Sequence, residues 1–478
     1  MAYNLRSVNR DQMYLMPPSL NEWLPEDDLA WFVIDAVSQM DLEPFYRKYR
    51  ADGRGNAAYD PAMMVCLLVY GYCMGERSSR RIEQLCKRDV GYRVITGNQM
   101  PDHCTIARFR QANEQELVGL FTQVLQLCAA AGLLKVGVVA LDGTKIQANA
   151  SLEANRTYAR IEEAVREWLT EAQAVDAEED RLYGEKRRGD ELPPELADRR
   201  SRLHRLMECK QRLEQEAAEA AATQQAKVEA AQAQEAATGK RRRGRKPNPP
   251  DPTPRPEARA NVTDPDSRVM KTRRGYVQGY NAQVVVTEGQ IVLAAAVTQE
   301  ANDVHQLHPM LCQARANLGV VEGAARIRAV VADAGYWSGA NLWEADAEGA
   351  ELLIAPAKEW RLRQAMRETP KPRGRIPANL SLRERMERKL LTQRGSALYA
   401  KRGQIVEPVF GQIKSVRGCS RFMRRGRLAC DREWKLICTA HNLLKLWRWA
   451  VSEVKEGRRK RKGMRSRMEE GSLAKLVV

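Results

Sequence analysis

The chain has 478 residues, a formal net charge of +17 and 44% hydrophobic residues, which is enough for about three domains with buried cores. No stretch approaches the ~18 apolar residues of a membrane-spanning helix, and the start of the chain lacks the apolar region of a secretory signal. With ten cysteines but no Cys-x-x-Cys pair, and five histidines, neither a zinc site nor a disulfide framework is expected. The positive charge predicts a polyanionic partner, above all nucleic acid.

Residues 1–133 are predicted to be helical. One segment, PEDDLAWFVIDAVSQM, combines an acidic first turn with apolar residues at helical spacing, and PAMMVCLLVYGYCMG starts with a proline at a first helical position. A later helix should begin at Asp102 and carries Arg108 and Arg110 in its first turns. Two short helices with a basic second member are typical of helix-turn-helix DNA readers. We therefore predict a DNA-binding domain with Arg108 and Arg110 as DNA contacts.

The apolar period changes at KVGVVALDGTKIQANAS, where a short β-branched run predicts a strand that ends in Asp142. Residues 156–238 are rich in Ala, Glu, Arg and Gln with apolar side chains on one face, which predicts a coiled-coil-like helical hairpin inserted in the fold. Residues 239–274 are basic and proline-rich and predict an exposed, extended linker. Within it, Arg243 and Arg245 belong to RGRKP, which is similar to a minor-groove DNA-binding motif, so both are predicted DNA contacts.

Strands return in GYNAQVVVTEGQIVLAAAVTQE, where the pair Glu288-Gly289 separates two β-runs as in a hairpin. RIRAVVADAGYWSGANLW predicts strand, turn and helix, ELLIAP another strand, and DREWKLICTAHNLLKLWRWAVSEV a long amphipathic helix. This order matches the ribonuclease-H-like fold, in which three antiparallel strands lie beside two parallel ones. The predicted class is α/β: an RNase-H-like mixed sheet flanked by helices, formed by residues 134–155 and 275–450, with a basic tail at 451–478.

Two acids follow apolar strands: Asp142 in VVALDGTK and Asp333 in AVVADAGYWS. A carboxylate there is unfavourable unless it is hydrogen-bonded or metal-bound, although a single such Asp is more often a turn former or helix cap. Two of them in one α/β domain of a very basic protein favour a site for a hard cation such as Mg²⁺ or Mn²⁺. The other acids of this region we interpret as caps and turn residues: Asp264, Asp266, Glu300 and Asp303.

A third acid stands in YAKRGQIVEPVFGQIK. Glu407 and Lys414 share a helical face if a helix starts or kinks at Pro408, so Glu407 can join the acids while Lys414 reaches a phosphate. Spacing alone leaves a second interpretation open, in which Glu407 is a surface residue paired with Arg402.

YAKRGQIVEPVFGQIK resembles the Tyr-Arg-Glu-Lys signature of bacterial insertion-sequence DDE transposases, with the four positions at Tyr399, Arg402, Glu407 and Lys414. LDGTKIQANAS and ADAGYWSGANL resemble the first and second aspartate motifs of that family, and NVTDPDSRVMKTRRGYVQGYNAQVVV the segment before its second strand. The first 130 residues are similar to the helical domain that precedes the catalytic core. Four residues separate Arg402 from Glu407, whereas the commonest pattern has three.

The resemblance implies that Asp142, Asp333 and Glu407 hold two divalent ions, Mg²⁺ with Mn²⁺ as a substitute, about 3.5–4 Å apart. The chain would be a DNA transposase that binds terminal inverted repeats, cleaves the element ends by metal-dependent hydrolysis and joins them to target DNA by strand transfer. No covalent protein–DNA intermediate is needed. Predicted DNA contacts around the site are the following: Tyr399, Arg402, Lys414 and Arg417.

The expected partners are double-stranded element ends and target DNA, with a dimer or higher oligomer on the DNA, in the bacterial cytoplasm and on the nucleoid, without a membrane. Two other functions compete. A structure-selective RNase-H-like nuclease shares the acids but does not account for the signature segment or the helical domain. A non-catalytic DNA-binding protein derived from a transposase does not need the intact set of acids.

Overall fold

The computed structural model describes residues 19–49, 58–168, 170, 202–239, 248–272, 275–321, 326–347, 349–356, 364–365, 368–377 and 379–473, the last twenty of these as backbone only. The predicted DNA contacts Arg243 and Arg245 lie outside these ranges, as does the turn of the predicted helical hairpin. Among the described helices, none is long and apolar enough to cross a membrane.

The N-terminal region is helical, as predicted. Aspartates begin four of its helices: Asp28, Asp60, Asp89 and Asp102 each accept hydrogen bonds from backbone N–H groups of the first turn, which have no partner inside the helix. The helices are η1 (Leu20–Glu22), α1 (Leu29–Ser38), α2 (Glu43–Tyr46), α3 (Pro61–Met74), α4 (Ser79–Arg88), α5 (Val90–Ile95), α6 (His103–Ala112) and α7 (Glu114–Ala130). Most of α3 is buried, so it forms the centre of this group.

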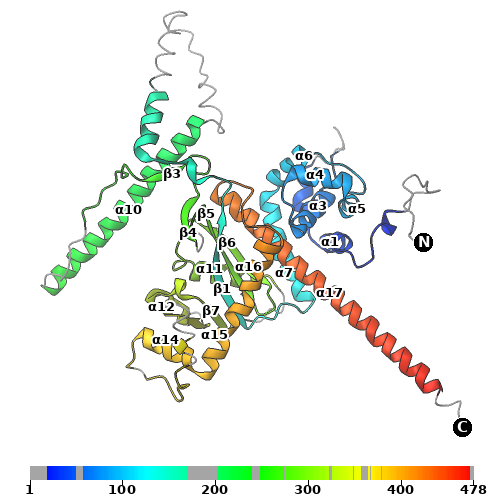
Figure 1. Cartoon of the computed structure of the whole chain (residues 1–478). Coiled ribbons are helices and arrows are strands. Elements are labelled where there is room, and N and C mark those ends of the chain that lie inside the picture. Colours follow the sequence, from blue (N-terminus) through cyan, green and yellow to red (C-terminus); the bar gives the residue numbers. More distant parts are fainter. Residues whose placement is uncertain are drawn as a thin grey trace, which may run out of the picture.

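A mixed sheet flanked by helices follows, which confirms the predicted α/β class (Figure 1). β5 is antiparallel to both β1 and β6, whereas β7 runs parallel to β1 and to β8. β4 pairs with the first residues of β5. The strands are β1 (Val138–Gln147), β4 (Arg268–Thr272), β5 (Gly275–Thr287), β6 (Val292–Thr298), β7 (Ala329–Ala332) and β8 (Glu351–Ile354).

The helices of this region are α11 (Leu307–Gly319), η3 (Ala334–Tyr336), α12 (Gly339–Ala347), α14 (Leu382–Leu391), α15 (Gln393–Ile405), α16 (Glu407–Gly411), the π-helix η4 (Gln412–Val416) and α17 (Arg427–Leu473). A capping box between Ser381 and Glu384 begins α14.

Two predictions of local structure are wrong. β1 does not end at Asp142 but continues to Gln147, because β5 is long enough to pair with it over its whole second half. The linker predicted at 239–274 contains strands β3 (Arg259–Asn261) and β4 near its end. The reason is that this part folds back onto β5 and buries polar groups such as Asp264, which accepts hydrogen bonds from the Tyr280 hydroxyl (2.8 Å) and from Gly426 N–H (3.0 Å).

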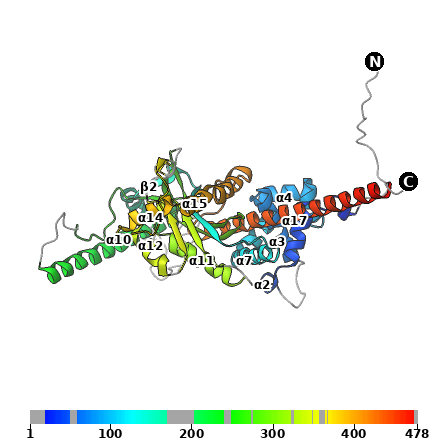
Figure 2. The same cartoon turned by 90° about the horizontal axis from the view of Figure 1, so that it is seen from below.

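The insertion has a small core of its own. Residues 158–168 are helical, and α10 (Arg202–Thr238) is the second helix; β2 (Asn155–Thr157) pairs with β3 at their base. The buried side chains that the two helices share are separate from the main core: Ile161, Val165, Leu206, Cys209 and Leu213. The described part thus has the two packed helices that the apolar face predicts. α10 and the end of α17 extend to opposite sides of the molecule (Figures 1 and 2).

Helix α17 closes the open edge of strand β6. The Asn442 side chain accepts from Val292 N–H (2.8 Å) and donates to the Val292 carbonyl (2.9 Å), and Asp431 accepts from Val297 N–H (2.8 Å). Unpaired backbone groups of an edge strand must find partners or water, and here α17 supplies the partners. Trp434, fully buried, donates its indole N–H to the Gln283 carbonyl of β5 (3.0 Å).

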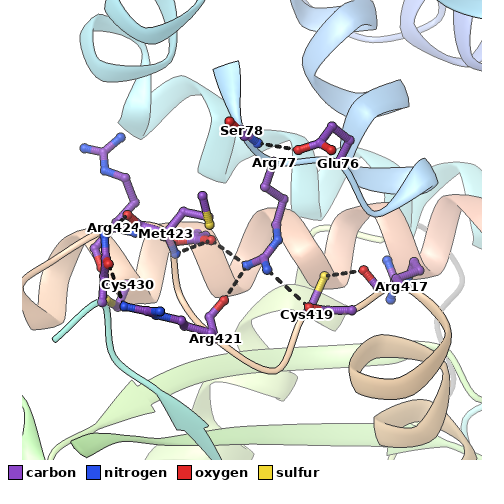
Figure 3. Close-up of polar contacts among 12 residues, drawn as sticks. Glu76, Arg77, Ser78, Arg417, Cys419, Arg421, Met423, Arg424 and Cys430 are labelled. Carbon is purple, nitrogen blue, oxygen red and sulfur yellow. Dashed lines mark hydrogen bonds and ion pairs between the residues drawn. The ribbon is translucent and has the colours of Figure 1, made fainter. Parts of the chain in front are cut away.

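The N-terminal helices are fixed to α17 by a buried ion pair, and to the segment before α17 by a hydrogen bond of the same arginine (Figure 3). Arg77, between α3 and α4, donates to Glu433 (2.9 Å) and to the carbonyl of Arg421 (2.7 Å). Glu433 also accepts from the backbone N–H groups of Met423 and Arg424. Next to this pair, a β-carbon on Gly75 would lie 2.5 Å from the Arg417 carbonyl oxygen, so only glycine permits the contact. The main hydrophobic core accordingly runs without interruption from these helices into the sheet.

We predict that Arg77→Met lowers the free energy of unfolding by about 3–5 kcal/mol, because it leaves the Glu433 carboxylate buried without its cation. Arg81→Met is the matched control, since Arg81 is mostly exposed and pairs with Glu76 at the surface, and we expect a change within about 0.5 kcal/mol. Urea denaturation measures both. Equal effects of the two substitutions would show that the buried pair does not hold these helices in place.

Candidate catalytic site

The strand register brings Asp142 and Asp333 together. β1 and β7 pair in parallel, and the last pair of this ladder is Leu141 with Ala332. The next residue after each of these is the predicted acid, so the two aspartates lie side by side at the carboxyl end of the parallel ladder, while Asp142 stays in β1 opposite Val284 of β5. Neighbouring strands lie about 4.8 Å apart, which sets the spacing of the two backbones.

Each of these aspartates is held by the glycine that follows it. Asp142 accepts from Gly143 N–H (2.8 Å), and Asp333 accepts from Gly335 N–H (2.9 Å) at the start of η3. Asp333 therefore forms a turn, as a single aspartate after a strand often does, and it also lies beside Asp142. Burial, and next the charge of Asp333, raise the pKa of Asp142 to about 7 although Arg402 opposes the shift.

Arg402 interacts with both Glu407, the third predicted acid, and Asp142, the first. This arginine is 5% exposed on α15, and its guanidinium donates to Asp142 Oδ2 (3.0 Å) and lies 3.9 Å from Glu407 Oε1. The Glu407 side chain is 60% exposed. Both interpretations of Glu407 therefore describe part of its position, because it pairs with Arg402 and through that residue lies near Asp142.

The kink at Pro408 is built into the chain. Proline has no backbone N–H, so the carbonyl of Gln404, four residues earlier, cannot receive its usual helical hydrogen bond. The Gln290 side chain, from the turn between β5 and β6, donates to this carbonyl instead (3.1 Å). α15 ends at Ile405 and α16 begins at Glu407, so the stretch between Arg402 and Glu407 contains the break between the two helices.

The carboxylates of Asp142, Asp333 and Glu407 do not form one close cluster. Among the described residues, the only three ligand side chains whose atoms all lie within 4.8 Å of one another are Asp102, His103 and Cys104. There Asp102 already caps α6, and His103 contacts Glu83 (2.7 Å). At the predicted site, like charges repel and the Arg402 guanidinium lies between Asp142 and Glu407.

The residues nevertheless fit divalent metal ions. A β-carbon on Gly335 would lie 3.0 Å from Asp333 Oδ1 and 3.1 Å from Asp303 Oδ2, and one on Gly143 would lie 2.8 Å from Asp303 Oδ1. The two glycines therefore keep the space among the carboxylates free of side chains. Carboxylate oxygens are the ligands that Mg²⁺ and Mn²⁺ prefer.

The signature segment also brings Lys414 to the site. Its ammonium group, on η4, donates to the Thr144 hydroxyl (3.0 Å) and the Lys145 carbonyl (2.9 Å), on the part of β1 that follows Asp142. Burial lowers the pKa of Lys414. Tyr399 is buried in α15, one turn before Arg402.

Four predicted DNA contacts are turned into the protein: Tyr399 and Arg402, which are buried in α15 as described above, and two further arginines. Arg417 is 7% exposed and donates to the Ile437 carbonyl (3.2 Å), and Arg110 donates to the Arg77 carbonyl (2.9 Å) and the Ser79 hydroxyl. Both guanidinium groups therefore hold the fold together, which argues against the predicted DNA contacts. Arg108 is exposed on α6 and stays a predicted contact.

Two families of known domains match the chain. Residues 18–112 match a transposase domain (DUF772), and residues 251–443 match a transposase DDE domain. The chain belongs to the insertion-sequence DDE transposases. The DDE match includes Asp333 and Glu407 of this transposase but begins after the insertion, so Asp142 lies outside it. Neither a curated protein nor a solved structure matches the chain.

One acid that lies near Asp142 and Asp333 was not predicted to be there. Asp303, interpreted as a helix cap, does not cap α11, whose first residues receive no side-chain hydrogen bond. It lies instead against Gly143 and Gly335. The feature of the sequence that could have indicated this position is that Asp303 follows β6, a strand whose end lies near the acids. The interpretation of Asp266 as a cap is confirmed, since it accepts from Arg427 N–H (2.9 Å) at the start of α17.

The raised pKa of Asp142 predicts how pH changes stability and metal binding. The folded protein holds the Asp142 proton more tightly than the unfolded chain, so without metal the stability should fall as pH rises from about 4 to about 7 and then level off. A divalent ion binds the ionised carboxylate, so the increase in Tm on adding Mg²⁺ should grow over the same interval.

Thermal unfolding in EDTA and in Mg²⁺ between about pH 5 and about pH 8 measures this effect. Asp142→Asn should remove most of the pH dependence of the Mg²⁺ effect, whereas Asp35→Asn, at an exposed position of α1, should retain it. A Mg²⁺ increment that is constant across this pH range would contradict the assignment of Asp142.

Proposed function

We propose that this transposase binds the terminal inverted repeats of its insertion sequence, hydrolyses the DNA at the element ends and joins those ends to target DNA. The observation that carries the proposal is the register of β1 and β7, which sets Asp142 beside Asp333. One segment, interrupted at Pro408, then adds Arg402 and Glu407 beside Asp142 and places Lys414 against Thr144 of the same strand.

The sheet supports an RNase-H-like catalytic domain. Five strands lie in the order β6-β5-β1-β7-β8, with three antiparallel strands followed by two that are parallel to β1. We propose the domain boundaries given by the sequence analysis, with the insertion as a separate unit because it has its own small core. DNA recognition by residues 1–133 would then come from a region that is packed firmly onto α17.

Asp142, Asp333 and Glu407 would hold the divalent ions, Mg²⁺ with Mn²⁺ as a substitute. When bound, such ions supply an activated water and stabilise the oxygen that leaves phosphorus. Arg402 keeps the carboxylates of Asp142 and Glu407 directed at the same space. Lys414 uses two of its three ammonium hydrogens on β1 and has the third for a phosphate oxygen of the DNA strand.

The two reactions balance without an external energy source. In hydrolysis, a water oxygen forms a bond to phosphorus, the bond from phosphorus to the 3′-oxygen breaks, and a free 3′-hydroxyl results. In strand transfer, this hydroxyl attacks a phosphodiester of the target, and one phosphorus–oxygen bond replaces another. The same acids serve both steps, so one site is sufficient.

Cleavage of DNA that carries the ends of the element tests the proposal. Asp142→Asn, Asp333→Asn and Glu407→Gln should each reduce cleavage by more than the roughly 100-fold cost of losing an outer-shell group, with DNA binding retained. EDTA should stop the wild-type reaction. Cleavage of branched or hybrid substrates without terminal repeats would indicate a structure-selective nuclease, and a wild-type protein that binds ends without cutting would indicate a non-catalytic DNA-binding protein.

Lys414→Ala should lower cleavage and strand transfer even at saturating metal, because the lost group positions a phosphate. Lys414→Arg should be partly active, since a positive charge is retained. Lys401→Ala is the matched control on α15, where Lys401 is exposed and pairs with Glu288 outside the site. Titration of Mn²⁺ against the cleavage rate decides the matter: full recovery of Lys414→Ala in excess metal would refute a phosphate contact.

A further inference from the structure

One carboxylate oxygen of Asp303, Oδ1, is held in place by neighbouring side chains. Its Oδ1 accepts from the Asn281 and Gln283 side-chain amides, both at 2.6 Å, and lies 3.8 Å from the Lys145 ammonium group. Asn281 and Gln283 are fully buried on β5. Two amide donors, both from a strand inside the sheet, and one cation therefore converge on a single carboxylate oxygen.

The other carboxylate oxygen of Asp303, Oδ2, points towards Asp333. Asp303 Oδ2 lies 3.1 Å from the β-carbon position of Gly335, and Asp333 Oδ1 lies 3.0 Å from that same point. Within the part of the chain that the structure describes, Oδ2 accepts no hydrogen bond. The charge of Asp303 also reaches Asp142, whose pKa it raises after burial and Asp333.

The Gln283 side chain can direct only its NH₂ group, and not its oxygen, to Asp303. Its Oε1 accepts the Tyr336 hydroxyl, so its amide hydrogens must point to Asp303. Tyr336 is fully buried, and burial raises its pKa well above the ordinary value, so the hydroxyl keeps the proton that it donates. Tyr336 belongs to η3, which begins directly after Asp333. The same chain of hydrogen bonds thus orients Asp303 and holds the turn that carries Asp333.

A carboxylate placed beside two others is unfavourable unless cations or donors compensate it. Here the compensation is applied to one oxygen only, which leaves the second directed at the common space. This is how outer-shell partners orient a metal ligand. We propose that Asp303 is a fourth carboxylate of the divalent-metal site, which binds through Oδ2 beside Asp333 while Asn281 and Gln283 orient it. The inference rests on the proposed function, since it adds a ligand to that site.

Binding of Mn²⁺ to the full-length protein without DNA tests the inference, with isothermal calorimetry and electron paramagnetic resonance as readouts. Asp303→Asn keeps the acceptor for Asn281 and Gln283 but removes the ligand oxygen and its charge. It should weaken at least one Mn²⁺-binding step by about tenfold or more. Glu300→Gln, three residues earlier on the same loop, is the matched control and should bind Mn²⁺ as the wild type does.

A purely structural role gives the opposite results. If Asp303 is a ligand, Asp303→Asn should raise the Tm in EDTA, because one of three repelling charges is gone. If it only anchors Asn281 and Gln283, the neutral acceptor of the asparagine should hold their amides less strongly than the carboxylate, so the Tm in EDTA should fall and Mn²⁺ affinity should stay unchanged. Unchanged Mn²⁺ affinity would overturn the inference.

A cysteine variant gives a second measurement that does not depend on the first. Thiolates bind Cd²⁺ strongly, so Asp303→Cys should show an ultraviolet cadmium–thiolate absorption band beyond that of the wild type, whose cysteines Cys104 and Cys312 are exposed. Absence of this band in folded protein would overturn the inference. Asp142→Asn separates the two proposals: if it weakens Mn²⁺ binding and Asp303→Asn does not, only the fourth ligand is rejected. If neither variant does, the metal site itself is rejected.

Discussion

The parallel pairing of β1 with β7 determines where everything else in the site must lie. Because the ladder ends with Leu141 opposite Ala332, the two residues that follow are neighbours, and a shift of one residue on either strand would send one aspartate to the other face of the sheet. β5 locks this register from the other side, since it pairs with β1 from Val139 to Gln147. The acids are therefore positioned by backbone hydrogen bonds of the core, and the loops only complete their surroundings.

Residues that are distant in sequence then add cations to this pair of acids. Arg402 and Lys414 come from one segment interrupted at Pro408, and each contacts β1 or its aspartate directly. Buried carboxylates attract such groups because isolated charge in the core is costly. The arrangement holds negative charge in place without neutralising all of it. The remaining negative charge is suited to a divalent ion, and Gly143 and Gly335 leave room for one.

Much of this could be predicted from the sequence, because local signals were strong. The β-branched runs and the helix caps predicted the mixed sheet and the N-terminal helices, while the role of the three acids stays a prediction. The failures have a common cause. Whether Arg110 and Arg417 face DNA or the Arg77 and Ile437 carbonyls depends on tertiary packing, which composition does not encode. Asp303 was missed because a loop aspartate before a helix is normally a cap, and only the β5 amides reveal that it is not.

The contact between Arg77 and the Arg421 carbonyl has a consequence for how such proteins can be rebuilt. Ser420 and Phe422, on either side of Arg421, form backbone hydrogen bonds with Gln147 at the far end of the strand that carries Asp142. The N-terminal helices are thus one hydrogen-bonded loop away from the strand that carries Asp142. A chimaera that exchanges these helices for the corresponding unit of another transposase would have to carry residues 417–433 with it. Otherwise the new unit would meet a loop shaped for a different partner, and the end of β1 would lose the neighbour that completes it.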